Sequence, residues 1–291
     1  MDLQTRLMQL RAKAQARGLA PSPASVPGLE RLEPLRVGAP ARGVSAAEAL
    51  EASVEGTVVA PGLIEVERTY ALPFEHGDVS IASGSSLAEA AKSVGRLSGA
   101  VSPEQLLFLD TETTGLSGGT GTTAFVVGVG WLEGCTLRLV QWLMAGFAAE
   151  NGLVARAANR IARAGVIVSF NGKSFDLPLL KTRARLVGRE LRADGLDHVD
   201  LLHVTRRLLR SGWPDCRLAT AEERALGLER TNDLPGAEAP AAWRRWLERG
   251  DPNLLGRVLD HNRADLLSLV ALLALLEHPT AREAPLLHAP A

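Results

Sequence analysis

The 291-residue sequence has few aromatic side chains, which make up 4% of it, and only two cysteines. Scarce aromatics offer few platforms on which bases could stack, so base-specific reading of a nucleic acid is not favoured. Cys135 and Cys216 lie far apart and fit neither a CxxC motif nor a Cys/His zinc pattern. We therefore expect two reduced thiols and no zinc site.

The sequence also lacks a surplus of charge and a long apolar run. Its formal net charge is −1, so a phosphate backbone would have to be held by local basic clusters or by bound metal ions. The longest apolar run, Leu266 to Leu276, is too short to span a bilayer. Asp2 and several basic residues stand where a secretory signal would need an apolar segment. We expect a cytoplasmic protein with no membrane partner.

The chain divides into four predicted regions. Residues 1–50 combine leucines at helical spacing with a Pro/Gly-rich linker from about Leu19 to Gly43, which is partly disordered in this prediction. Residues 51–100 form an extension: two alternating runs around Pro61-Gly62 predict a β-hairpin, and Ser86 with Glu89 predicts a capped helix. Residues 101–280 are the main domain, and residues 281–291 are a flexible tail.

The main domain is predicted to be α/β. Short apolar strands at Leu106–Leu109, Ala124–Trp131 and Thr136–Trp142, with a tight turn at Glu133-Gly134, make an antiparallel meander. A helix from Glu150 to Ala164 and a fully buried strand from Val166 to Phe170 follow, and helices fill most of the rest. A mixed sheet with a meander, flanked by helices and preceded by the small hairpin and helix extension, is the ribonuclease H-like fold.

Two acids at the end of the first of these strands are the strongest chemical signal. Asp110 and Glu112 are spaced i and i+2, so in a strand their carboxylates share one face. Such a pair repels unless a cation lies between the two groups, and oxygen ligands of this kind favour Mg²⁺ or Mn²⁺. Two solvated acids at a strand end remain an alternative.

Two further acids follow later in the chain. Asp176 comes after the buried strand and Asn171-Gly172, where it could instead serve as a helix N-cap. Asp265 opens an apolar helix, with His261 on the same helical face. A carboxylate so close to a core usually has a counter-ion or a metal ion, although a His–Asp surface pair is the plainer alternative.

Together these motifs resemble the DEDD exonuclease superfamily, and in detail the YprB-like branch of ribonuclease H-like domain proteins. The resemblance covers roughly residues 55–277. The closer likeness is carried by further segments: Gly115 to Thr123, Asp200 to His203 with Arg206-Arg207, Cys216 to Leu218, Asp233 to Gly236, and His261 to Asp265. The glycine-rich segment has no Gly-Lys-Ser/Thr ending, so a turn into the next strand explains it better than a phosphate-binding P-loop.

The resemblance implies a nuclease that hydrolyses phosphodiester bonds with two Mg²⁺ or Mn²⁺ ions and acts as a 3′→5′ exonuclease on single-stranded DNA or RNA ends. The expected metal ligands are Asp110, Glu112, Asp176 and Asp265. His261 is the expected proton acceptor, although it precedes the last acid by four residues where histidine-type members of the superfamily have five. Candidate nucleic-acid contacts flank these motifs: Thr113, Gly115, Asn171, Lys173, Arg206 and Arg207. Endonuclease action by the same metal site, an inactive nucleic-acid-binding module and an enzyme acting on small nucleotides remain alternatives.

Overall fold

The structure is a computed structural model that describes residues 46–115, 121–209, 213–230 and 233–276. All of these residues belong to one compact unit. The predicted N-terminal helix and most of the linker region, and the predicted C-terminal tail, lie outside the described residues. The proposed division at residues 50, 100 and 280 therefore stays a prediction.

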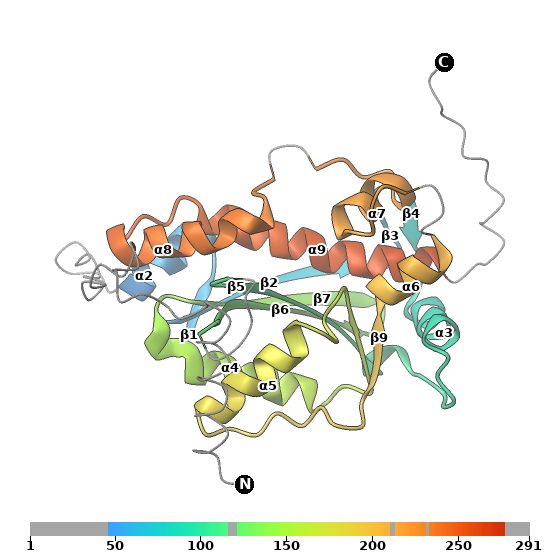
Figure 1. Cartoon of the computed structure of the whole chain (residues 1–291), viewed down its shortest axis with the longest axis horizontal. Coiled ribbons are helices and arrows are strands. Elements are labelled where there is room, and N and C mark those ends of the chain that lie inside the picture. The colour runs from blue at the N-terminus through green and yellow to red at the C-terminus, as the bar shows by residue number, and fades with distance from the viewer. Residues whose placement is uncertain (1–45, 116–120, 210–212, 231–232, 277–291) are drawn as a thin grey trace, which may run out of the picture. The chain divides into compact units, whose positions relative to one another are not determined.

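A mixed seven-stranded sheet is the centre of the described fold (Figure 1), with the strand order β1-β2-β7-β6-β5-β8-β9. Neighbouring strands from β1 to β5 are antiparallel, whereas β8 and β9 run parallel to β5. The strands of this sheet are β1 (Thr57–Ala60), β2 (Leu63–Ala71), β5 (Leu106–Thr113), β6 (Ala124–Glu133), β7 (Thr136–Met144), β8 (Val166–Ser169) and β9 (Asp197–Asp200).

Helices cover both faces of the sheet. The long helix α9 crosses one face together with α2 and α8, and α4 and α5 cover the other (Figure 1). Because both faces are covered, β8 and nine of the ten residues of β6 are buried. The helices are α2 (Ala46–Val54), α3 (Gly84–Gly95), α4 (Glu150–Ile161), α5 (Asp176–Leu186), α6 (Leu201–Leu208), α7 (Leu218–Ala225), α8 (Ala239–Arg249) and α9 (Leu255–Leu275), with 3₁₀ turns at Pro103–Gln105, Phe147–Ala149 and Gly236–Glu238.

The predicted meander is confirmed as β5, β6 and β7, and the predicted hairpin as β1 and β2. The hairpin does not stand apart: β2 pairs along its whole length with β7, from Leu63 opposite Met144 to Ala71 opposite Thr136. A second, two-stranded sheet, β3 (Phe74–His76) and β4 (Val79–Ile81), was not predicted. It matters for the site because His76 reaches Ser268 on α9, with Nε2 2.9 Å from the serine Oγ.

Several predicted boundaries were wrong, and each has a local cause. Helix α3 begins at Gly84 because the side chain of Ser83, not Ser86, accepts the hydrogen bond from an early helical N–H group. Strand β5 continues through the acids to Thr113, and α9 begins at Leu255. Asp265 therefore lies in the middle of a helix rather than at its start. Strand β9 was missed because it has four residues and one apolar side chain, Val199, which is too little to show a period.

Within the described ranges, no helix is both long enough and apolar enough to cross a membrane.

Candidate active site

The site is built where β5 passes beneath α9. Asp110 on β5 lies opposite Gly128 on β6, which in turn lies opposite Gln141 on β7, so the three form one row across the sheet. A Cβ atom at Gly128 would lie 2.1 Å from Oδ1 of Asn262 on α9. The missing side chain at Gly128 therefore makes the room that lets α9 approach this row closely.

Asn262 uses this room to connect β7 to the first acid. Its Oδ1 accepts a hydrogen bond of 2.8 Å from Nε2 of Gln141, and its Nδ2 donates one of 2.6 Å to Oδ2 of Asp110. Nε2 of Gln141 also donates to the backbone carbonyl of Leu259, one turn earlier on α9. Both amides are buried, so these bonds fix the orientation of the Asp110 carboxylate without supplying a charge.

Asp176 reaches the same region from the first turn of α5. It is the first residue of the helix and not its N-cap, which is Phe175. The hydroxyl of Thr111, the residue between the two acids of β5, donates a hydrogen bond of 2.5 Å to Oδ1 of Asp176. Gly172 lies beneath it, because a Cβ atom there would be 3.1 Å from Oδ2 of Asp176. The expected helix start is thus confirmed, and it positions the third acid beside β5.

Burial and mutual repulsion both act on these acids. Burial is the largest cause that raises the pKa of Asp110 well above its usual range. It does the same for Glu112, which is 7% exposed, and it raises the pKa of Asp176 to about 6. Neighbouring carboxylates also raise the pKa of Asp110, and they are those of Asp265, Asp176 and Glu112. Charges shift a pKa in this way when they lie near one another, and the hydrogen bonds Thr111–Asp176 and Asn262–Asp110 bring β5, α5 and α9 side by side at this point.

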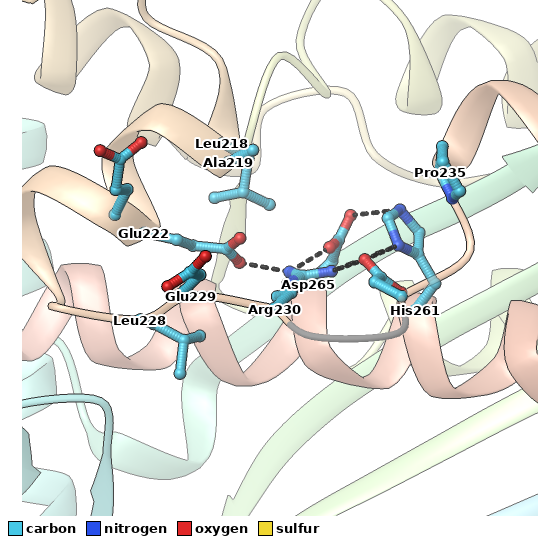
Figure 2. Close-up of a pocket in the computed structure, with 11 residues that line it drawn as sticks. Leu218, Ala219, Glu222, Leu228, Glu229, Arg230, Pro235, His261 and Asp265 are labelled. Atoms are coloured by element: carbon cyan, nitrogen blue, oxygen red, sulfur yellow. Dashed lines mark hydrogen bonds and ion pairs between the residues drawn. The ribbon is translucent and has the colours of Figure 1, made fainter.

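Asp265 differs from the other three because a cation contacts it. Its Oδ1 accepts a hydrogen bond of 2.5 Å from Nη2 of Arg230, in the segment that follows α7. The same guanidinium is bonded to Glu222 on α7, and its Nη1 lies 3.2 Å from Oδ2 of Asp233. Figure 2 shows the guanidinium of Arg230 between the carboxylates of Glu222 and Asp265. Burial alone would lower the pKa of Arg230, but these two carboxylates outweigh it and raise the pKa.

His261 lies one helical turn before Asp265 and faces the same group of side chains. Its Nδ1 is 2.7 Å from Oδ2 of Asp233, and its Nε2 is 3.7 Å from Oδ2 of Asp265. Nη1 of Arg230 also lies 3.3 Å from this Nδ1, but the contact with Asp233 is the shorter one. Because a carboxylate can only accept a hydrogen bond, the shorter contact assigns the proton to Nδ1 in the neutral ring. Nε2 then keeps its lone pair, and the backbone at Gly236 lies beside it, because a Cβ atom there would be 3.1 Å away.

The candidate nucleic-acid contacts come from three segments, of which two are close in sequence to the acids. Thr113 and Gly115 follow the acids directly, and the Thr113 hydroxyl donates to the Gly115 carbonyl. Asn171, with a φ of 68°, begins the turn before α5. The backbone N–H groups of Asn171 and Lys173 both donate to the carboxylate of Asp200, at 2.8 and 3.1 Å. Asp200 therefore organises this turn, and it also caps α6 through the Leu202 N–H.

The two arginines of α6 lie elsewhere. Arg206 and Arg207 are in the last turn of α6, and Nη2 of Arg207 donates to the carbonyl of Val94 in the last turn of α3. This bond satisfies a helix C-terminal carbonyl and accounts for the position of Arg207 without a nucleic acid. A role for either arginine in binding stays a prediction.

Six side chains of the site were not among those predicted from the sequence: Thr111, Gln141, Glu222, Arg230, Asp233 and Asn262. The sequence contained a sign of Asn262 and Glu222, because each is a polar residue at a helical spacing otherwise taken by apolar residues. In the structure both side chains are buried, at 0% and 2% exposure. The sequence contained no such sign of Arg230, because it stands in a loop among other charged residues.

The chemistry of these donors, though not their present spacing, suits a hard divalent cation. Buried carboxylate oxygens that raise one another's pKa are the ligand set such an ion stabilises. Across the described ranges, no three His, Cys, Asp or Glu side chains are arranged so that they could hold a metal ion. Each oxygen of Asp265 is near another side chain: Oδ1 accepts a hydrogen bond from Arg230, and Oδ2 lies near Nε2 of His261.

Comparison with known proteins agrees with the fold. A family model described as the RNase_H superfamily matches residues 107–277, and the chain belongs to this superfamily. The chain is similar to the uncharacterized protein YprB of Bacillus subtilis (strain 168), with 37% identity over 168 residues. That match covers 57% of this chain and 40% of YprB, so it spans less than half of the relative.

A likeness to a solved structure was also found. The family B DNA polymerase from the hyperthermophilic archaeon Pyrobaculum calidifontis matches 79% of this chain and 33% of its own, with 17% identity and a TM-score of 0.43. Superfamily membership supports a nuclease-type function that depends on divalent metal ions.

Proposed function

We propose that this chain is a metal-dependent nuclease of the DEDD type, which hydrolyses phosphodiester bonds of DNA or RNA from single-stranded 3′ ends. The observation that carries the proposal is that acids come together from three separate segments, β5, α5 and α9. The hydrogen bond from Thr111 to Asp176 joins β5 to α5, and the one from Asn262 to Asp110 joins α9 to β5, so that the carboxylates raise one another's pKa. A cluster of this kind is unfavourable by itself and becomes stable when cations neutralise it.

In this proposal Asp110, Glu112, Asp176 and Asp265 would hold two Mg²⁺ or Mn²⁺ ions. Such ions supply Lewis-acid chemistry: they lower the pKa of a bound water and stabilise the departing 3′ oxygen. The protein supplies the orientation of its ligands. Asn262, itself held by Gln141, orients Asp110, and the Thr111 hydroxyl orients Asp176. These hydrogen bonds are neutral and leave the carboxylate charges available.

His261 is the proposed proton acceptor. With its Nδ1 proton directed to Asp233, its Nε2 is the nitrogen that would take the proton of the attacking water. Asp233 is then the positioning residue that keeps the ring in this tautomer. The one-turn spacing of His261 and Asp265 places both groups on the same face of α9.

The approach of the substrate would depend on the cations, because the acids alone repel phosphate. The turn from Asn171 to Lys173 and the residues Thr113 and Gly115 lie next to the acids along the chain, and we propose that they contact the nucleic-acid backbone. We assign the activity to the cytoplasm, where the free thiols of Cys135 and Cys216 would stay reduced.

A digestion experiment tests the proposal. Single-stranded DNA and RNA, each labelled at the 5′ end, and a dinucleotide are incubated with the full chain in Mg²⁺, Mn²⁺ or chelator. We expect ladders that shorten from the 3′ end with either metal and no products with chelator. Asp110→Asn should lower the rate at least about a hundredfold, because it removes one charged ligand. Asp197→Asn is the matched control, since Asp197 is an exposed acid at the start of β9.

Other outcomes separate the alternatives. Internal fragments would replace the exonuclease with an endonuclease that uses the same acids. Cleavage of the dinucleotide alone would indicate an enzyme of small nucleotides. No cleavage by the wild-type chain with either metal would refute the nuclease and favour a binding module.

A further inference from the structure

Arg230 contacts three acids at once, at the boundary of the proposed metal site. Its Nη2 donates to both Glu222 and Asp265, and its Nη1 lies 3.2 Å from Asp233. The Nε atom is buried and has no hydrogen-bond partner in the described part of the chain. A buried donor without a partner costs about 1–3 kcal/mol, so this position does not satisfy the whole guanidinium.

Glu222 is the fixed end of this arrangement. It is 2% exposed, lies on α7, and accepts a hydrogen bond from Ser268 on α9 as well as the one from Arg230. The Ser268 hydroxyl is in turn 2.9 Å from Nε2 of His76 on β3. Because Glu222 is buried and held from two sides, it cannot follow Arg230 if the arginine moves. Burial raises the pKa of Glu222, and the nearby charge of Arg230 opposes that rise.

Asp265 is the exchangeable end. It is one of the four acids whose charges act on one another, and its carboxylate raises the pKa of both Asp110 and Glu112. Its own nearest cation is Arg230. Arg230, His261 and Asp265 also line a cavity of about 800 Å³, so an ion from solution can reach this carboxylate. The guanidinium of Arg230 therefore neutralises the Asp265 carboxylate, as a metal ion would do in the proposed nuclease.

We infer that Arg230 is a built-in counter-ion that holds Asp265 while no metal is bound, and that a divalent cation displaces it from Asp265 on binding. The inference rests on the metal site of the proposed function. The bond to Glu222 remains after the exchange, so the guanidinium turns away from Asp265 but stays beside the site. Metal binding in the wild-type chain is thus weakened by the separation of an ion pair and by the positive charge next to the incoming cation.

The test measures binding of Mn²⁺ alone to the full chain, from the loss of the electron paramagnetic resonance signal of free Mn²⁺. Arg230→Gln removes the charge and keeps a side-chain amide, and we expect it to bind Mn²⁺ at least about tenfold more tightly than the wild type. Arg230→Lys keeps the charge without the planar fork and should lie between the two. Arg263→Gln is the matched control on α9, because Arg263 pairs with Asp260 and not with the site acids. Its affinity should stay within about twofold of the wild type, since the charge of Arg263 is already paired with Asp260 and is partly screened by solvent.

Equal or weaker Mn²⁺ binding by Arg230→Gln, with binding by the wild type, would overturn the inference and leave the proposed nuclease standing. No Mn²⁺ binding by any variant would instead refute the metal site itself. A second measurement needs no variant: a crystal structure of the wild-type chain with Mn²⁺. We expect an ion on the acids and the Arg230–Asp265 hydrogen bond broken, and persistence of that bond beside a bound ion would overturn the inference.

Discussion

The acids of the site fall into two groups that differ in how their charge is balanced. Asp110, Glu112 and Asp176, on the β5 and α5 side, have pKa values raised chiefly by burial. The hydrogen-bond donors that contact Asp110 and Asp176 are neutral, an amide and a hydroxyl.

The second group lies on the α7 and α9 side and shares one arginine. Glu222, Asp233 and Asp265 all contact Arg230, and Asp233 also contacts His261. The same side-chain types, two aspartates and one glutamate in each group, therefore occur in two settings within a single site. We call the first the unbalanced group, because the donors that contact it are neutral, and the second the balanced group, because it shares the cation of Arg230. A metal ion would therefore stabilise the unbalanced group most, whereas at the balanced group it must compete with Arg230.

The largest expected effect is a loss of stability on replacing Glu222, the buried member of the balanced group. Glu222→Ala leaves the buried Arg230 without its fixed partner, so the free energy of unfolding should fall by about 3 kcal/mol. Denaturant unfolding in metal-free buffer measures it. The control is Glu223→Ala, an exposed acid of the same helix, which should change stability by less than about 0.5 kcal/mol. Equal losses for both variants would show that the Glu222–Arg230 pair has no special role.

The two groups should respond in opposite directions to the same change. Asp265→Asn removes a charged acceptor from Arg230 and should lower the free energy of unfolding by about 2 kcal/mol without metal. Asp110→Asn removes a buried and repelled charge but keeps an acceptor for Asn262, so it should raise stability by about 1 kcal/mol. Thermal unfolding with chelator compares the variants, and effects of one sign would contradict the distinction between the groups.

Gly128 tests the packing of the unbalanced group, because it leaves room for Asn262, the residue that bonds to Asp110. Gly128→Ala places a methyl group where the Asn262 amide lies, so it should displace α9 locally and cost about 1–2 kcal/mol of unfolding free energy. Gly99→Ala is the control, because a Cβ atom there meets no atom within 4 Å. If the two alanine variants have the same stability, α9 does not depend on the gap at Gly128.

The smallest expected effect is a pH dependence from His76, next to the balanced group. Burial, and then the charge of Arg230, lower its pKa to about 4 from the ordinary value of 6.5. Below pH 6.5 the unfolded chain therefore binds a proton that the folded chain does not, so His76 lowers stability progressively as the pH falls towards 4.

His76→Gln should remove this contribution, which we expect to be about 1 kcal/mol at pH 4.5 after screening by solvent. The measurement is the difference in unfolding free energy between variant and wild type at pH 7.5 and pH 4.5. Taking this difference matters because Asp176, with a pKa raised to about 6, acts in the opposite sense over the same range. A difference that does not change with pH would contradict the assignment.

Much of the site was predictable because its signals are local. Two acids two residues apart after an apolar strand share a face in any strand, and Asp176 follows the next buried strand by a single turn. Other features depend on packing between segments far apart in the chain. Asn262 meets Asp110 across 152 residues, and Gln141 across 121, only because α9 crosses the row opened by Gly128.

The sequence alone determined the strands of the hairpin and the meander, the order of the acids and the kind of ion they suit, because backbone periodicity and oxygen chemistry act within a few residues. It did not reveal the short strands β3, β4 and β9. Only the tertiary structure decided which acids have a partner. Arg230 stands 35 residues before Asp265, and it reaches that acid because α7 and α9 pack together around Glu222. Electrostatic energy depends on the distance between charges in space and on their burial, and neither can be deduced from how far apart two residues lie in the sequence.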